Sequence, residues 1–154
     1  MSAWRRGWKK IKDSTPTKWK RVWIANYPNA THYSPNFTRA ELDCKCGCAT
    51  PKHIEKALRQ TAVQLEKLRK HWNAPMHITS GYRCVTHNRR VGGAPNSQHL
   101  QGKAADVIVA RFLQDGFVQD AEKVPAFKNG GIGRYPAQGF VHVDRRGTHA
   151  RWVG

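Results

Sequence analysis

Two histidines and an aspartate occur at spacings that could bind a metal ion. His99 and Asp106 lie on either side of a glycine, and Asp106 falls within an apolar segment typical of a buried strand. His142 lies much later, within a Val-His-Val segment. Two imidazoles and one carboxylate form the ligand set of a catalytic zinc site, because three protein ligands leave the fourth tetrahedral position for water. The alternative from spacing alone is that these are ordinary surface residues.

The segment around His142 has the alternation of a β-strand. Residues i and i+2 of a strand point to the same face of a sheet. Phe140, His142 and Asp144 therefore share one face, whereas Val141 and Val143 point into the core. Packing alone does not require a histidine and an aspartate together on one face, so this face is a candidate site.

A long helix precedes these segments. Thr50 is its expected N-cap, Pro51 its expected first residue, and Asn73-Ala74-Pro75 its expected end. The apolar stripe of this helix consists of Ile54, Leu58, Leu65, Leu68 and Trp72.

Short strands make up most of the rest. They are expected over 76–79, 104–109, 132–135 and 140–145, with a turn at Pro136 and Gly139 joining the last two. Residues 26–50 and 84–98 are typical of loops, and 113–129 are ambiguous, with a short helix near 117–123. Helices followed by strands favour an α+β fold with an antiparallel sheet.

Three segments together make the sequence resemble a known family: SGYRC at 80–84, NSQHLQGKAAD at 96–106 and GFVHVDRR at 139–146. They resemble the zinc D-Ala-D-Ala carboxypeptidases and their phage endolysin relatives, in the metallopeptidase group that includes the Hedgehog signalling domain. The resemblance covers about residues 35–153. It implies a small antiparallel sheet with flanking helices, of the Hedgehog and DD-peptidase type.

The resemblance also implies roles for single residues. His99, Asp106 and His142 match the ligands of Zn²⁺. Arg83, in SGYR, matches the arginine that holds the scissile carbonyl oxygen or the terminal carboxylate of the peptide, a task that suits a planar, permanently charged group. Ser97 matches a position that contacts either the substrate or the loop that carries the ligands.

The general base is the main departure from the family pattern. Many relatives carry a carboxylate three residues before the last histidine ligand, and here that position is Gly139. Asp144 shares a strand face with His142, so we expect Asp144 to be the catalytic base. The alternative is that it fixes His99 or Arg83 by a hydrogen bond.

The four cysteines are Cys44, Cys46, Cys48 and Cys84. The C-x-C-x-C spacing differs from that of structural zinc ribbons, so a four-cysteine zinc site is the weaker alternative. The resemblance implies a disulfide from Cys84 to Cys44 or Cys46 if the protein reaches an oxidising compartment.

Charge is the leading feature of the composition, with 27 Lys and Arg against 10 Asp and Glu and a net charge of +17. Residues 1–25 form an expected basic helical arm rich in tryptophan, followed by a zinc peptidase domain over 26–154. The composition of this arm indicates either that it binds an anionic cell wall or membrane surface or that it packs on the domain as an extra helical layer. Nucleic acid is not an expected partner, since basic residues alone would support it.

The resemblance implies a zinc-dependent peptidase that cleaves peptidoglycan stem peptides, by a carboxypeptidase or an endopeptidase activity. The alternative is a non-catalytic zinc-containing module that binds the wall or forms part of a virion. We expect a monomer outside a virion. The basic start has no apolar core after it and so does not read as a secretory signal. We therefore expect action at the bacterial cell wall after delivery by a phage lysis system, by a virion or by another export route.

Overall fold

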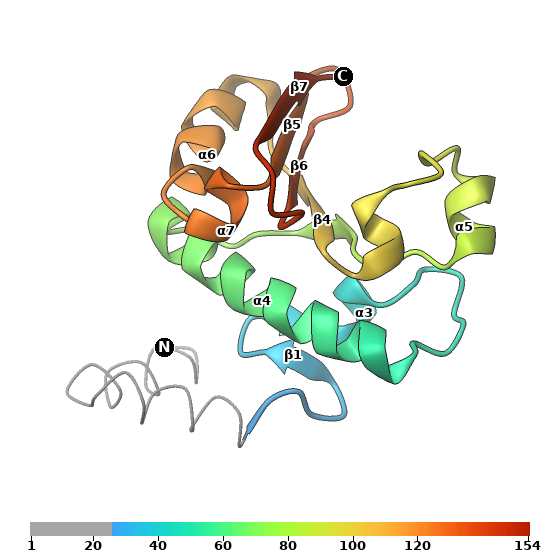
Figure 1. The fold of residues 1–154 in the computed structure, drawn as a ribbon. Coiled ribbons are helices and arrows are strands. Elements are labelled where there is room, and N and C mark those ends of the chain that lie inside the picture. Colours follow the sequence, from blue (N-terminus) through green and yellow to red (C-terminus); the bar gives the residue numbers. More distant parts are fainter. Residues whose placement is uncertain (1–25) are drawn as a thin grey trace.

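The computed structural model describes residues 26–154, which form a five-stranded main sheet with helices against it and a small two-stranded sheet (Figure 1). The predicted arm over 1–25 lies outside the described residues. Within residues 26–154, no helix is long and apolar enough to cross a membrane.

The main sheet has five strands in the order β3-β4-β6-β5-β7. Neighbouring strands are antiparallel, except that β5 and β7 are parallel. This confirms the predicted α+β class. The strands are β3 (Ile78–Ser80), β4 (Ala104–Ile108), β5 (Gly131–Tyr135), β6 (Phe140–Asp144) and β7 (Ala150–Val153).

The long helix α4 (Lys52–Trp72) crosses beside the sheet (Figure 1). It begins one residue later than predicted, and the N-cap is Pro51 rather than Thr50. The extended ψ of 149° at Pro51 keeps this residue outside the helix, while its carbonyl accepts the helical hydrogen bond from Glu55 at 2.9 Å. The helix ends as predicted at Asn73, which has a left-handed φ of 57°.

The core lies between α4 and one face of the sheet. The predicted stripe of α4 is buried up to Leu68, and Trp72 packs partly buried at its edge. From the sheet, Val141 and Val143 are fully buried, as the strand alternation predicts. The short helices α6 (Gln114–Ala121) and α7 (Pro125–Lys128) complete the core with Phe117 and Phe127.

Several short elements lie where loops were predicted. Residues 26–50 contain β1 (His32–Ser34), β2 (Phe37–Thr38) and α3 (Arg39–Leu42), and residues 84–98 contain α5 (Val85–Arg90). The 3-10 helices are η1 (Gln98–Gln101) and η2 (Arg111–Leu113). Elements of two to six residues are too short to display a hydrophobic period, so their sequences resemble loops.

A buried glutamate fastens the β1–β2 turn to α4. Glu66 is 2% exposed. Its carboxylate accepts hydrogen bonds from the Ser34 hydroxyl at 2.7 Å and from the backbone and side-chain amides of Asn36, both at 2.8 Å. Burial raises the pKa of Glu66, although these hydrogen bonds oppose that shift.

We therefore expect Glu66→Ala to lower the free energy of unfolding by about 2–3 kcal/mol, because it leaves buried donors of Ser34 and Asn36 without an acceptor. Urea unfolding measures this. The matched control is Glu55→Ala on the same helix, which removes a partly exposed ion pair to Arg39 and should cost no more than about 1 kcal/mol. Equal losses in the two variants would contradict the anchoring role of Glu66.

Candidate metal centre

Two neighbouring strands bring the predicted carboxylate and the second histidine together. In the β4–β6 ladder, Asp106 lies directly opposite His142. Their strand neighbours Ala105, Val107, Val141 and Val143 belong to the core, so both side chains project from the opposite face of the sheet.

His99 arrives from outside the sheet, on the 3-10 helix η1. The exposed fractions of His99, Asp106 and His142 are 2%, 6% and 8%. The structure thus brings together all three predicted ligands in a largely buried site.

The three side chains present ligand atoms to one point. One atom from each lies within 4.8 Å of the others. The Oδ1 atom of Asp106 is 3.2 Å from Nε2 of His99 and 2.9 Å from Nδ1 of His142.

The outward-facing atom of each ligand has its own partner. Nδ1 of His99 lies 2.6 Å from the carbonyl oxygen of Gly81, and Nε2 of His142 lies 2.8 Å from Oδ2 of Asp144. Both partners can only accept, so these outward nitrogens carry the protons. The Oδ2 atom of Asp106 accepts from Nη2 of Arg83 at 3.0 Å.

These partners leave lone pairs facing one another at the centre. With neutral rings, Nε2 of His99 and Nδ1 of His142 direct lone pairs toward the Asp106 carboxylate, an arrangement that requires a cation between them. Burial lowers the pKa of His142, but hydrogen bonds to Asp106 and Asp144 outweigh burial and raise it, so the surroundings of this ring favour positive charge. Two nitrogens and one oxygen, with outer atoms held by hydrogen bonds, fit Zn²⁺ with a fourth position left open.

Arg83 lies against the ligand set. Besides its bond to Asp106, it donates from Nε to the Ser80 hydroxyl at 2.9 Å. Burial alone would raise the pKa of Asp106, but hydrogen bonds from His142 and His99 hold it well below the usual range. A contact of Arg83 with substrate stays a prediction.

Asp144 lies behind His142 and is fully buried. Its carboxylate accepts five hydrogen bonds: from His142 Nε2, from the backbone amides of Gly131 and Arg146, and from Nε and Nη2 of Arg146. The close approach needs a glycine at 131, where a Cβ atom would collide with the carboxylate.

This environment supports a positioning role for Asp144 rather than that of general base, but its partner is His142 and not His99 or Arg83 as predicted. Burial raises its pKa, but hydrogen bonds from Arg146 and His142 outweigh burial and keep the pKa below the usual range. An effective general base has a pKa near the working pH and a proton within reach. Asp144 has neither feature, and it directly orients His142.

Ser97 caps η1 and does not belong to the ligand set. Its hydroxyl accepts a hydrogen bond from the backbone amide of His99 at 3.2 Å. Of the two roles predicted for Ser97, this contact supports the one at the ligand loop.

Three contacts at the site were not predicted from the sequence. They are the Gly81 carbonyl, the Arg146 clamp on Asp144, and Trp152, whose ring centroid lies 5.2 Å from that of His142. Backbone carbonyls carry no sequence signal, and Trp152 arrives on β7, a strand that the pattern did not indicate.

Fold and site together define a metalloprotein with a His-Asp-His centre on an antiparallel sheet. A family model described as Peptidase M15 matches residues 35–144, so the chain belongs to the Peptidase M15 family. That range contains all three ligands as well as Arg83 and Asp144.

The chain is also similar to curated proteins. The probable peptidoglycan L,D-endopeptidase MepK of Haemophilus influenzae is 38% identical over 87 residues, which are 53% of this chain and 45% of that protein. The zinc D-Ala-D-Ala carboxypeptidase of Streptomyces albus G is 40% identical over 78 residues, 47% of this chain and 31% of that protein. MepK of Escherichia coli K12 is 32% identical over 75 residues, 46% of this chain and 40% of that protein. The chain thus matches less than half the length of each of these relatives.

The two roles considered for Asp144 predict different results for Asp144→Asn. If Asp144 orients His142, the affinity for Zn²⁺ should fall by roughly 10- to 100-fold, the usual cost of losing such a partner. Excess zinc should then restore most of the activity. Competition with a chromophoric chelator measures the affinity, and Asp120→Asn, at a surface ion pair with Lys123, is the matched control.

Unchanged zinc affinity, with a loss of activity of roughly 10²- to 10⁴-fold that excess zinc does not restore, would instead identify Asp144 as the base.

Proposed function

We propose that this protein is a zinc-dependent peptidase that cleaves peptide bonds in the stem peptides of peptidoglycan. The observation that carries the proposal is the convergence of His99, Asp106 and His142 within the part of the chain that matches the Peptidase M15 family. The relatives, a probable and a named peptidoglycan L,D-endopeptidase and a zinc D-Ala-D-Ala carboxypeptidase, support peptidoglycan as substrate and zinc as metal.

The ligand residues would hold Zn²⁺, and the groups behind them would hold the ligands. Such an ion supplies a bound water of lowered pKa and polarises the scissile carbonyl group. The hydrogen bonds that the imidazoles donate to the Gly81 carbonyl and the Asp144 carboxylate keep each ring in the tautomer that presents a lone pair inward. In the proposed reaction Asp144 acts through His142 as a positioning residue.

Arg83 is the proposed contact for the substrate. Its Nε and Nη2 atoms are occupied by Ser80 and Asp106, which fixes the plane of the guanidinium. Its Nη1 atom has only a long contact of 3.5 Å with Asn88. We assign this atom to the carbonyl oxygen or terminal carboxylate of the bound peptide.

A second candidate function is a non-catalytic zinc-containing module that binds the cell wall or forms part of a virion. Two observations favour it. Position 139 carries a glycine where the family resemblance implies an acid, and the Asp144 carboxylate is fully occupied by hydrogen bonds.

Digestion of purified peptidoglycan, followed by mass spectrometry of the released muropeptides, separates the two functions. The peptidase should release new amino groups and identify the bond cleaved. His99→Ala should lose both zinc and cleavage, whereas His53→Ala, at an exposed position on α4, should keep both.

A wild-type protein that holds zinc and binds the sacculi but releases no amines would contradict the peptidase function and favour the binding module. Equal cleavage by His99→Ala would remove the centre from the reaction.

We further propose that residues 1–25 concentrate the protein on the anionic wall or membrane surface of a bacterium. The support is their composition, since residues 1–23 carry eight Lys and Arg against one acid. Delivery by a phage lysis system or within a virion stays a prediction, as does the monomeric state.

Neutralising three basic residues of this arm should weaken binding to sacculi by roughly tenfold, because each contact with an anionic surface contributes at most about 1 kcal/mol. Cleavage of a small soluble peptide should not change. The substitutions to glutamine are at Lys9, Lys10 and Lys12.

The control variant changes the same amount of charge on an exposed part of α4, at Lys52, Lys56 and Lys67. Sedimentation with sacculi at rising salt measures binding, and the wild-type advantage should shrink as salt screens the charges. Equal weakening in both variants would contradict a specific role for the arm.

A further inference from the structure

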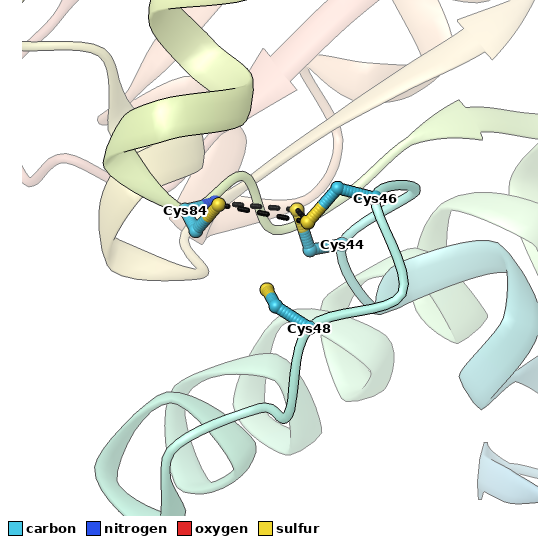
Figure 2. Close-up of side chains that lie close together, drawn as sticks. All are labelled: Cys44, Cys46, Cys48 and Cys84. Carbon is cyan, nitrogen blue, oxygen red and sulfur yellow. Dashed lines mark hydrogen bonds between the residues drawn. The ribbon is translucent and has the colours of Figure 1, made fainter.

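A second group of metal-ligating side chains lies outside the His-Asp-His centre. Cys44, Cys46 and Cys48 come from the loop between α3 and α4, and Cys84 is the residue that precedes α5. Their sulfur atoms all lie within 4.8 Å of one another, and Figure 2 shows the four side chains pointing to a common centre.

The spacing of these sulfur atoms suits a shared metal ion. Sγ of Cys46 lies 3.3 Å from Sγ of Cys44 and 3.7 Å from Sγ of Cys84. Zinc-to-sulfur bonds of about 2.3 Å in a tetrahedron place sulfur atoms about 3.8 Å apart, whereas a disulfide holds them at about 2.05 Å. All four cysteines are free, so the expected disulfide from Cys84 to Cys44 or Cys46 is absent.

The loop conformation explains how a C-x-C-x-C segment can supply three ligands. Gly47 has a φ of 80°, and its amide donates to the carbonyl oxygen of Cys44 at 3.1 Å. This turn spans Cys44 to Gly47, and the chain then continues to Cys48. The left-handed conformation is one that glycine adopts at little cost, so the glycine within CKCGC makes the unusual spacing workable.

Backbone amides already point at two of the sulfur atoms. The amide of Cys84 donates to Sγ of Cys44, and the amide of His87 donates to Sγ of Cys84, both at 3.4 Å. Hydrogen bonds of this kind favour the thiolate over the thiol and orient metal-bound sulfur.

We propose that Cys44, Cys46, Cys48 and Cys84 bind a second Zn²⁺ ion, in a closed structural site separate from the peptidase centre. Four protein ligands leave no position for water, so this ion has no part in hydrolysis. The thiols give up their protons on binding, and no change of oxidation state is involved. The site does not depend on the proposed peptidase function.

The second zinc site would hold in place the segment over 80–84, which supports the peptidase centre. Arg83 adjoins Cys84 in the chain, and the carbonyl of Gly81 holds His99. The same segment is bonded to α3 through the amide of Tyr82, which donates to the Leu42 carbonyl at 2.7 Å. A metal joining Cys84 to the loop after α3 would fasten this segment a second time.

Metal analysis of the purified whole chain under reducing conditions tests the proposal. We expect about two zinc ions per chain, one of them removed by His142→Ala. X-ray absorption spectra of that variant, recorded at the zinc edge, should show only sulfur ligands, at about 2.3 Å from the zinc ion. This readout holds whether or not the protein cleaves peptidoglycan.

Cys48→Ser should lose the second zinc ion and keep the first. Lys45→Ser, which changes the same loop but leaves all four thiols, is the matched control and should keep both ions. If Cys48→Ser does not fold, the wild-type count and the spectrum of His142→Ala still decide the matter.

One zinc ion in the wild type with four freely reactive thiols would overturn the proposal. A disulfide found by mass spectrometry of the unreduced protein, or iron in place of the second zinc, would also overturn it.

Discussion

The site depends on one electrostatic constraint: three electron-rich atoms are made to face one another. The outward nitrogens of His99 and His142 are committed to acceptors, the Gly81 carbonyl and the Asp144 carboxylate. Their inward lone pairs therefore meet Oδ1 of Asp106, 3.2 and 2.9 Å away. Only a cation relieves this repulsion in a site so thoroughly buried, because water cannot screen the charges there. The directions of the hydrogen bonds around the ligands thus prepare this site to bind a metal ion.

Much of the remaining structure maintains this arrangement. The antiparallel register sets Asp106 beside His142, and the valines on the reverse of β4 and β6 fix the sheet against α4. Arg146 pairs with the fully buried Asp144 and favours its ionised form. The segment 80–84 supplies both the carbonyl that holds His99 and the arginine that holds Asp106. Its attachment to the cysteine loop therefore bears on the geometry of the centre.

The sequence predicts the site better than it predicts the surrounding loops. Alternation in FVHVD places His142 and Asp144 opposite the valines, and that prediction is confirmed because a two-residue period survives in five residues. The strands β1, β2 and β7 are too short or too polar to carry such a signal. The prediction that Asp144 is the general base is not supported by the structure, for a different reason. The strand alternation places Asp144 on the same face as His142. It does not reveal that Arg146 and Gly131 donate hydrogen bonds to the carboxylate oxygens of Asp144, which only the three-dimensional structure shows.

A crystal structure of the zinc-loaded protein, with anomalous data at the zinc edge, tests the central claim most directly. We predict a zinc peak about 2.0–2.2 Å from Nε2 of His99, Oδ1 of Asp106 and Nδ1 of His142. The hydrogen bonds that the outer nitrogens donate to Gly81 and Asp144 should remain intact. Zinc bound through Nε2 of His142, with Asp144 displaced, would contradict the account, and so would a metal peak that does not involve these three residues.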